Sequence, residues 1–517
     1  MLYTELTMKR DTINIPREVE TIVAMLVDAG FEAYPVGGCV RDLLRGIKPY
    51  DWDVTTSAKP EEILHLFPES FYENAFLTVT VKTESEDPTL KEIEVTTYRN
   101  EGRYTDKRHP DEVNYAKTLD EDLSRRDFTI NAMALDLEYG IRNTESGIKT
   151  KFQIPNSKFR IIDPFDGQKD VNNKIIRAVG DPSKRFDEDA LRMMRAVRFT
   201  AQLGFEIEEK TKHAIAKLSH TIELIAHERI RDEFIKMVKS SAGRAVIDLM
   251  HEVGLLKHII PELEEGIGME NRPRIFTIWD HNLKAFDYGV KADFAWDVRI
   301  AALLHDVAKP ATRGPKKNDE WTFYGHDVVG GKMAMRILQR LHFPRVTIEK
   351  IATLIRWHLF KYESEEGTTD SSIRRLIRHV GAENMNDLVK VRICDRMGMD
   401  VPKAVPYRLR HFQFRVEKIL REEEAPTPKM LQIKGEDIMR ILAIAPGPKI
   451  GRVIEVLMQE VIDDPSLNQK IILEKRVAEL GILPDEELMK IAQAAETKVE
   501  MTEDERVSEM KAKYWVK

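Results

Sequence analysis

The chain has 517 residues, of which 42% are hydrophobic and 32% charged, a balance typical of a soluble, helix-rich protein with several domains. Its formal net charge is −7, which argues against a general nucleic-acid coat, so RNA binding would require a local basic surface. No apolar run approaches the roughly 20 residues that span a bilayer, the start has no signal-peptide core, and Cys39 and Cys394 form no paired pattern, so we expect a cytoplasmic protein without membrane contact or a disulfide framework.

The first third of the chain mixes helices and strands. Residues 14–35 contain an amphipathic helix and then a short apolar strand, which stops at Gly37-Gly38 before a second helix begins. Two strand-like runs follow at 76–82 and 91–98, where β-branched residues alternate with polar ones. This pattern predicts a mixed α/β domain.

From about Ile175 onward, the helical period continues almost without interruption. The stretch 405–430, which ends in EEEAPTPKM, is typical of a linker into a small module at 431–485. Residues 486–517 are rich in acids and lysines and predict a solvated helix. The simplest reading of the chain is therefore an α/β head on an all-α body.

A glycine pair and an acidic pair carry the chemistry of the head. Gly37-Gly38 lies between a strand and a helix, where backbone amides either approach a phosphate or form a purely structural turn. Asp51 and Asp53 open a predicted strand, and their i, i+2 spacing points both carboxylates to one face. Two neighbouring carboxylates repel unless a cation joins them, so the pair predicts a two-metal site rather than an Asp-rich turn.

A third metal ligand is expected on the strand at 91–98. Glu94 is the candidate, although Glu92 has the same parity and spacing alone does not decide between them. Two Mg²⁺ ions held by such a triad would lower the pKa of an attacking ribose hydroxyl and neutralise a leaving pyrophosphate. The reaction class predicted from these residues is nucleotidyl transfer.

Four separated motifs carry a family resemblance. In order, they are GGCVRDLLRG with YDWDV, RRDFTINAMALD, IIDPFDG and EDALRMMRAVRF. Together they resemble the class II tRNA nucleotidyltransferase and bacterial poly(A) polymerase family over about residues 30–240. The resemblance implies an α+β fold: a small polymerase-beta-like nucleotidyltransferase head followed by an extended all-α body. It also implies a template-independent enzyme that uses CTP and ATP to add or repair the CCA at the 3′ end of tRNA.

The resemblance assigns roles to residues of the head. Asp51 and Asp53 would bind the metals, and Gly38 and Arg41 would contact the nucleoside triphosphate. The motif RRDFTINA would recognise sugar and phosphates through Arg126 and Asp127.

A predicted helix at 188–198 would select the base. Asp189, Arg192, Arg195 and Arg198 are spaced i, i+3, i+6 and i+9, so adjacent members lie on one helical face. In the resembling family, a carboxylate beside a guanidinium replaces a nucleic-acid template, which implies Asp189 and Arg192 here. Arg195 and Arg198 would support this pair or hold phosphates. The alternative is a solvent-facing helix whose charged residues form ion pairs and have no role in binding.

Two polar stretches interrupt the head. Residues between Arg99 and Asp122 resemble the family's flexible loop, which is associated with the switch from C to A addition. The stretch 139–160 is an insertion that either contacts RNA or forms a surface hairpin.

A second constellation lies in the helical body, where His281, the doublet His305-Asp306 and the distant Asp395 all fall on predicted helices. Such residues can converge on one divalent metal, and the pattern resembles the HD phosphohydrolase superfamily. The resemblance implies these four as metal ligands. His326 and His358 are further candidates, for a second metal or for phosphate contact.

The module at 431–485 is predicted to bind RNA. Gly447 lies between two prolines at a helix start, which favours either a phosphate contact or a tight turn, and Lys434 and Lys449 would add positive charge.

These expectations divide the chain into five parts: a head at 1–170, a helical neck at 171–270, an HD domain at 271–404, an RNA-binding tail at 405–485 and an extension at 486–517. Three alternatives remain: a poly(A) polymerase or A-adding enzyme of the same family, an HD-type metal-dependent phosphohydrolase whose head only binds nucleotides, and a pure RNA-binding protein.

Overall fold

The computed structural model describes most of the chain. The described residues are 15–73, 77–101, 113–137, 139–143, 149–153, 160–272, 276–318, 320–362, 368–400, 403–424 and 431–515. They fall into two compact units, Met1–Arg356 with Cys394–Asp400 and Trp357–Ile393 with Val401–Lys517. Within the described residues, no helix is both long and apolar enough to cross a membrane.

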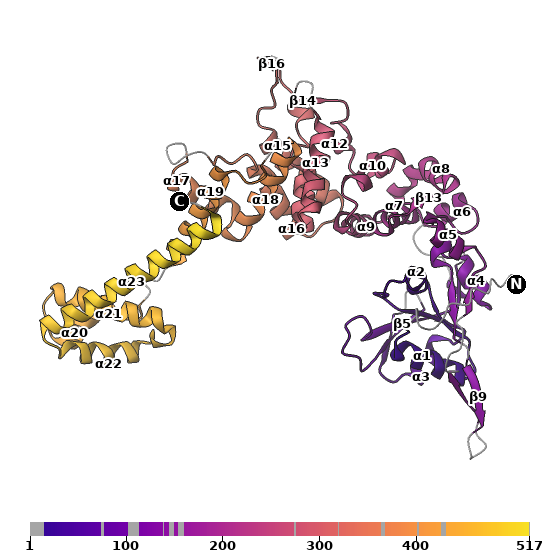
Figure 1. The fold of residues 1–517 in the computed structure, drawn as a ribbon, viewed down its shortest axis with the longest axis horizontal. Helices are drawn as coiled ribbons and strands as arrows, with labels where there is room; N and C mark the ends of the chain where they lie inside the picture. Colours follow the sequence, from indigo (N-terminus) through magenta and orange to yellow (C-terminus); the bar gives the residue numbers. More distant parts are fainter. Residues whose placement is uncertain are drawn as a thin grey trace. The chain divides into compact units, whose positions relative to one another are not determined.

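The head is built on one seven-stranded mixed sheet with the strand order β11-β8-β1-β2-β5-β4-β3. Figure 1 shows the head at the N-terminal end of the chain, in indigo and violet. Neighbouring strands are antiparallel except β2 and β5, which run parallel. The strand-like runs of the sequence correspond to β4 and β5, whose Val79 and Val95 are fully buried. The strands are β1 Ala33–Val36, β2 Asp53–Thr56, β3 Ser70–Glu73, β4 Thr78–Lys82, β5 Glu92–Thr97, β8 Ala134–Asp136 and β11 Arg160–Ile162.

Short helices surround this sheet. They are α1 Arg17–Asp28, α2 Gly38–Leu44, α3 Pro60–Leu66, α4 Leu119–Ser124, the 3₁₀ turn η2 Thr129–Asn131 and α5 Gly167–Asn173. The first of them is amphipathic as predicted: Val19, Ile22, Val23 and Leu26 are buried on one face, and α1 packs against β1. The burial of this face fixes α1 on the sheet.

The two polar stretches of the head both contain strands. Strands β6 (Arg99–Glu101) and β7 (Val113–Tyr115) form an antiparallel pair at the ends of the predicted flexible loop, whose residues 102–112 lie outside the described residues. The predicted insertion contains the hairpin of β9 (Tyr139–Asn143) and β10 (Lys149–Gln153), and its residues 144–148 and 154–159 also lie outside the described part.

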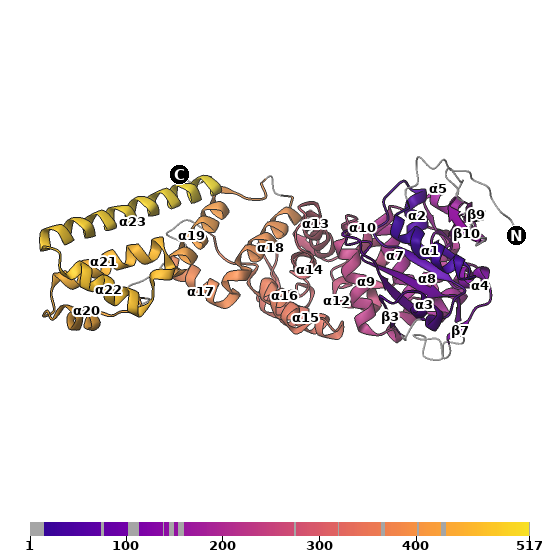
Figure 2. The same cartoon turned by 90° about the horizontal axis from the view of Figure 1, so that it is seen from below.

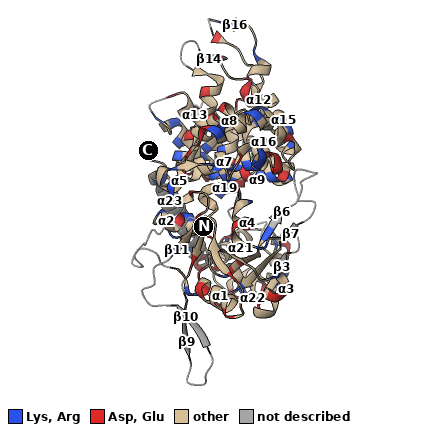
Figure 3. Cartoon of the chain, turned by 90° about the vertical axis from the view of Figure 1, so that its right-hand side faces the viewer, with Lys and Arg blue, Asp and Glu red and all other residues tan. Residues whose placement is uncertain are grey.

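The remainder of the first unit is mainly helical. The segment after the head contains β12 Ile175–Ile176, α6 Pro182–Glu188, α7 Leu191–Leu203, β13 Glu206–Ile207, α8 Glu209–Leu218, η3 Ser219–Leu224, α9 His227–Lys239, α10 Arg244–Glu252, α11 Leu256–Ile259 and α12 Pro261–Glu264. Helices α7 and α9 pack side by side (Figure 2). Acidic and basic residues are interspersed along the helices of this unit (Figure 3).

A helical region with two small hairpins completes this unit. Its elements are β14 Glu270–Arg272, β15 Phe276–Thr277, α13 Ile278–Lys291, α14 Trp296–Leu304, η4 Pro310–Thr312, β16 Lys316–Lys317, β17 Glu320–Trp321, α15 His326–Arg340 and α16 Arg345–Trp357. Helix α18 (Met385–Gly398) contributes its last turns, from Cys394 onward. The predicted fold class, an α/β head followed by an all-α body, is confirmed.

The second unit is helical throughout its described residues. It contains α17 Asp370–Val380, η5 Ala382–Asn384, α19 Tyr407–Glu424, α20 Gly435–Leu442, α21 Pro448–Asp463, η7 Pro465–Leu467, α22 Lys470–Gly481 and α23 Asp485–Tyr514. The charged extension predicted at 486–517 is the helix α23, whose Leu488 and Ala492 join the hydrophobic core formed by α20, α21 and α22.

The predicted linker at 405–430 is wrong over most of its length, because it contains the helix α19. Leu409, Phe412, Val416 and Ile419 recur at helical spacing and are buried. The Phe412 ring stacks on Phe360 at a centroid distance of 4.8 Å. The acidic and proline-rich end of the stretch obscured this periodicity, and residues 425–430 lie outside the described residues.

Candidate active site and a histidine–aspartate cluster

The glycine pair forms a sharp turn between β1 and α2. Gly37 has φ 85° and ψ −130°, a conformation that side chains disfavour. A Cβ atom at Gly37 would lie 3.0 Å from Arg126 Nη1 and 3.7 Å from Asp53 Oδ2, and one at Gly38 would lie 3.5 Å from Arg41 Nη2. The turn therefore lies directly against charged groups from three other parts of the head.

Strand register brings the acidic residues to this turn. Asp53 is the first residue of β2 and is opposite Val36 on β1 and Glu94 on β5. Glu92, the first residue of β5, is instead opposite Lys82 on β4, so Glu94 is the acidic residue in register with Asp53. Asp51 precedes the strand and is exposed, so the expectation that the strand itself carries both aspartates is wrong.

The acidic groups interact electrostatically. Burial raises the pKa of Asp53, the charges of Asp51 and Glu94 raise it as well, and Arg126 lowers it; the net result is a pKa of about 7. Three carboxylates that repel one another are a donor set that suits a hard divalent cation with oxygen ligands. The residues present therefore fit the predicted metal site.

The RRDFTINA motif is held by a buried ion-pair network. Asp122 on α4 is fully buried and accepts hydrogen bonds from Arg125 Nη2 at 2.7 Å and from Arg126 Nη2 at 3.3 Å. Asp127 Oδ2 accepts a hydrogen bond from Arg195 Nε at 2.7 Å. Burial raises the pKa of Asp127, but the charge of Arg195 and the hydrogen bonds outweigh it and hold this pKa at about 2.

Asp127→Asn should lower the free energy of unfolding by about 2 kcal/mol at neutral pH, since the folded-state pKa of about 2 lies below the ordinary 3.8. A carboxyl with a depressed pKa contributes stability that is present above its ordinary pKa and is lost as the pH falls through the folded value. Urea unfolding of both proteins at several pH values between about 6 and 2.5 measures this. The difference between them should shrink with falling pH, and a pH-independent difference would contradict the ion pair.

Asp189 does not lie on the helix predicted at 188–198. It occupies a break between α6 and α7 with an extended backbone, φ −142° and ψ 104°, and its Oδ1 accepts a hydrogen bond from Leu191 N at 3.0 Å. Aspartate competes with helix continuation through such local bonds. The i, i+3 argument was therefore wrong for Asp189, although its backbone carbonyl accepts a hydrogen bond from Arg192 N at 3.1 Å.

The three arginines of α7 have different partners. Arg192 is buried and donates to Glu188 Oε2 at 2.6 Å and to the carbonyls of Arg185 and Arg125. Arg195 holds Asp127 as described above. Arg198 forms an ion pair with Glu233 Oε2 at 2.7 Å.

All the predicted head residues line one cavity of about 990 Å³. They are Gly38, Arg41, Asp51, Asp53, Glu94, Arg126, Asp127, Asp189, Arg192, Arg195 and Arg198. The structure thus brings together the carboxylates, the glycine turn and the Asp189 and Arg192 edge from separate motifs. Their individual roles stay predictions.

Sequence reasoning missed three further residues of this cavity: Asn131, Phe199 and Arg229. Asn131 accepts a hydrogen bond from Arg41 Nη1 at 2.8 Å and donates to Asp127 at 3.2 Å; its place in the RRDFTINA motif was a usable signal. The guanidinium carbons of Arg41 and Arg198 lie 5.6 and 4.3 Å from the centroid of the Phe199 ring, a cation–π arrangement that only the fold creates.

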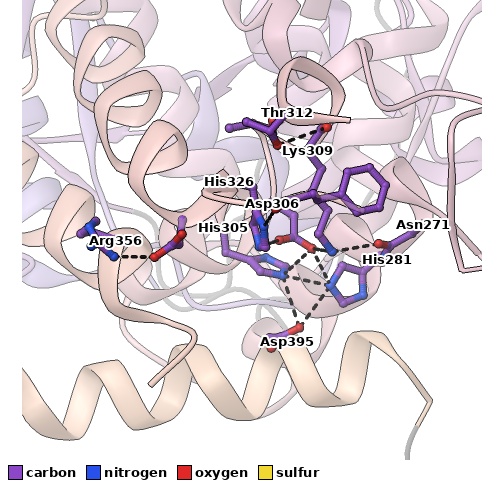
Figure 4. Close-up of polar contacts among 12 residues, drawn as sticks. Asn271, His281, His305, Asp306, Lys309, Thr312, His326, Arg356 and Asp395 are labelled. Carbon is purple, nitrogen blue, oxygen red and sulfur yellow. Dashed lines mark hydrogen bonds and ion pairs between the residues drawn. The ribbon is translucent and has the colours of Figure 1, made fainter. Parts of the chain in front are cut away.

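The histidine–aspartate cluster forms where α13, the end of α14 and α18 meet. The side chains of His281, His305, Asp306 and Asp395 point toward one another (Figure 4). His281 Nε2 lies 2.9 Å from His305 Nε2, 3.2 Å from Asp306 Oδ2 and 3.2 Å from Asp395 Oδ1. Ligand atoms bound at about 2.0–2.2 Å to one ion, at right angles, lie about 3 Å apart, so this donor set fits a divalent metal.

The cluster is buried and strongly coupled. Burial lowers the pKa of His305, but Asp306 and Asp395 outweigh it and raise this pKa to about 10. Lys309 Nζ contacts Asp306 Oδ2 at 2.5 Å and donates to Asn271 at 2.8 Å. The Lys309 ammonium therefore compensates part of the negative charge of Asp306.

Of the two further histidine candidates, His326 begins α15 and its Nε2 lies 3.2 Å from Asp306 Oδ1. His358 is buried in the second unit. Both stay predictions.

In the second unit, Gly447 precedes α21 in an extended conformation. Lys449 donates to the carbonyls of Gly481 and Leu483 and pairs with Asp485 at 3.3 Å. Its charge therefore stabilises the module itself.

The fold and the cavity define a nucleotidyltransferase of the polymerase head type, whose helical body carries a candidate metal-binding cluster. Residues 33–177 match the family described as poly A polymerase head domain, 204–267 match the probable RNA and SrmB-binding site of polymerase A, and 278–400 match the HD domain. The nucleotidyltransferase and HD families both depend on divalent metals.

Similar proteins give the particular family. The CCA-adding enzyme of Enterococcus faecalis is 32% identical over 90% of this chain and 97% of that enzyme. The CCA-adding enzyme of Lactobacillus helveticus is 50% identical over 42% of this chain and 48% of that enzyme, so this match spans about half the relative. The structure of the Bacillus stearothermophilus CCA-adding enzyme in complex with CTP has a TM-score of 0.55 and 25% identity over 90% of this chain and 98% of that one. The chain belongs to the family of CCA-adding enzymes.

Proposed function

We propose that this protein adds or repairs the 3′-terminal CCA of tRNA from CTP and ATP. The observation that carries the proposal is the cavity that the carboxylates of Asp51, Asp53 and Glu94 line together with Asp189 and Arg192. A solved relative, the Bacillus stearothermophilus CCA-adding enzyme, holds CTP, and the curated relatives are CCA-adding enzymes, which supports these substrates. An enzyme of tRNA processing would act in the cytoplasm.

Asp51, Asp53 and Glu94 would hold Mg²⁺ in the head. When bound, the metal lowers the pKa of the attacking ribose hydroxyl and neutralises the leaving pyrophosphate. Gly38 and Arg41 would contact the triphosphate from the turn that precedes α2.

The sugar and the base would be read by different elements. Asp127, locked by Arg195 and Asn131, would position Arg126 beside the sugar and phosphates. Asp189 offers a hydrogen-bond acceptor and Arg192 a donor, the two groups that a protein edge needs to recognise cytosine or adenine without a template.

The activity is tested with tRNA transcripts that end in the discriminator base or in CC, incubated with CTP or ATP separately. A CCA-adding enzyme incorporates CTP on the first transcript and ATP on the second. An A-adding enzyme uses ATP alone, and a poly(A) polymerase extends both transcripts with many adenosines; either result would replace the proposal.

We further propose that the histidine–aspartate cluster binds a second divalent metal and hydrolyses phosphoesters. The four-residue donor set with its neighbouring Lys309 supports this second candidate function. On this proposal, the cluster lies in an HD domain at 271–404, between a neck at 171–270 and an RNA-binding tail at 405–485.

Metal binding at the cluster can be measured without any substrate. In a protein that carries Asp53→Asn in the head, Mn²⁺ should raise the melting temperature, because a ligand at 100 times its Kd stabilises by about 2.7 kcal/mol. Adding Asp306→Asn should abolish this rise. The matched control is Asp327→Asn, an acidic residue of α15 that pairs with Arg356. An Mn²⁺-induced rise that persists in the Asp306→Asn protein would exclude the cluster as the metal site.

A further inference from the structure

The loop between α2 and β2 carries an exposed aromatic side chain beside the acidic pair. Tyr50 is 84% exposed and directly precedes Asp51, which is exposed as well. The residues on either side of this pair, Pro49 and Trp52, are both buried, Trp52 to 1% exposure. The stretch is therefore anchored at both ends, and Tyr50 and Asp51 face solvent from an anchored backbone.

The ring of Tyr50 is accessible at the rim of the active cavity. Among the described residues, two aromatic side chains line this cavity, Tyr50 and Phe199. Phe199 is 6% exposed, and the guanidinium carbons of Arg198 and Arg195 lie 4.3 and 5.5 Å from its ring centroid, so this ring is already packed within the protein. Ile47, in the same loop as Tyr50, also lines the cavity and is 47% exposed. Exposed apolar side chains beside a polar cavity are typical of a ligand-binding surface.

The geometry of the reaction leaves a separate side of the cavity for the acceptor RNA. In such a displacement, the attacking hydroxyl and the leaving pyrophosphate lie roughly in line on opposite sides of the phosphorus. The proposed function assigns the triphosphate to the glycine turn before α2 and the incoming base to the Asp189 and Arg192 edge. The 3′ hydroxyl of the acceptor must therefore approach the carboxylates from another direction, and Tyr50 adjoins the exposed carboxylate of Asp51.

Three different acceptor ends must fit one site. On the proposed function, the acceptor ends first in the discriminator base, then in the first added cytosine and then in the second. Hydrogen bonds that read the acceptor base would reject some of these ends. Stacking on an aromatic ring tolerates any sequence, because every base has a π-face. An accessible ring is therefore the group that suits this step.

We propose that Tyr50 binds the acceptor: its ring stacks on the 3′-terminal base of the RNA and so holds the ribose hydroxyl at the carboxylates. The inference rests on the proposed function of the cavity. It concerns the RNA strand alone, so binding of the incoming nucleotide should not depend on this ring.

The test removes each partner of the stacking contact in turn. On the protein, Tyr50→Ala removes the ring and Tyr50→Phe keeps it. On the RNA, a tRNA acceptor whose last nucleotide is abasic, with a free 3′ hydroxyl, removes the base. Single-turnover addition of CTP gives the half-saturating concentrations of acceptor and of CTP for each combination. The matched control is Tyr324→Ala, because Tyr324 is 77% exposed and lies just before α15, in the helical body.

We expect Tyr50→Ala to raise the half-saturating concentration of the normal acceptor by about tenfold or more, the loss of one base–aromatic stack. The half-saturating concentration of CTP should not change. Acceptors that end in the discriminator base or in the first cytosine should be affected alike, and Tyr50→Phe and Tyr324→Ala should match the wild type. The abasic acceptor should bind the wild type about tenfold more weakly than the normal one, and Tyr50→Ala should cause no further loss with it.

Two results would overturn the proposal. One is an equal loss in Tyr50→Ala with the normal and the abasic acceptor, which would make Tyr50 a structural residue of the loop. The other is a higher half-saturating concentration of CTP with unchanged acceptor binding, which would place the ring against the incoming nucleotide. If Tyr50→Ala does not fold, the wild type decides, because equal binding of the normal and abasic acceptors contradicts stacking. A wild type that incorporates neither CTP nor ATP would overturn the proposed function instead.

Discussion

Asp53→Asn is expected to reduce nucleotide addition by about a thousandfold or more, while the protein stays folded. Metal ions at such sites supply several kcal/mol of transition-state stabilisation, and each 1.4 kcal/mol is a factor of ten in rate. Asparagine keeps the shape of the side chain but removes the charge that holds the cation. The measurement is single-turnover incorporation of CTP into tRNA that lacks CCA.

The stability of this variant separates a chemical effect from unfolding. Burial and the charges of Asp51 and Glu94 all raise the pKa of Asp53, so its ionised form is disfavoured in the metal-free protein. Removing that charge should leave the melting temperature unchanged or raise it. Asp87→Asn is the control: among the described residues, its side chain pairs with Lys48 and Thr89 near the surface, and the substitution should leave addition unchanged. Substantial residual activity in Asp53→Asn would exclude the carboxylate cluster as the catalytic centre.

Gly167→Ala should be the most destabilising single-methyl substitution in the head, at about 3 kcal/mol or more. A Cβ at this position would lie 2.3 Å from the carbonyl oxygen of Thr129 and 2.8 Å from Met133 Cγ. The first neighbour is backbone and cannot rotate away, so α5 or η2 must shift, and overpacking of this kind costs about 1–3 kcal/mol and occasionally more. Equilibrium unfolding in urea measures the loss.

The same substitution should also weaken nucleotide addition. The 3₁₀ turn η2 ends at Asn131, which binds both Arg41 and Asp127, so a shift of η2 moves groups of the cavity. Gly451→Ala is the matched control, because Gly451 lies inside α21 with nothing within 4 Å of its Cβ position. There alanine should stabilise by about 0.5–1 kcal/mol. Equal stability of Gly167→Ala and the wild type would show that α5 tolerates the displacement.

The fold class and the cavity residues that lie in the recognised motifs were predictable from sequence. The motifs around Asp53, Asp127 and Arg192 are each continuous in sequence, and the chemistry of each residue type follows from the side chain alone. The helical spacing of hydrophobic residues likewise predicts α1 and the helical body, because a helix that buries one face has apolar residues at every third or fourth position. The predicted linker failed where charged and proline-rich residues masked the period of α19.

The tertiary structure decided which of these side chains contact one another. Glu94 is preferred over Glu92 only by the register of β5 against β2, and Arg195 serves Asp127 rather than the base-reading pair. The ion pair between Asp189 and Arg229 requires the packing of α9 against α7. Spacing along the chain fixes which face of an element a residue occupies. Which charged groups contact one another depends on strand register and helix packing between segments far apart in sequence. The chain offers several partners of the same charge and similar size for each group, and only the packing of the hydrophobic core determines which of them lies within reach.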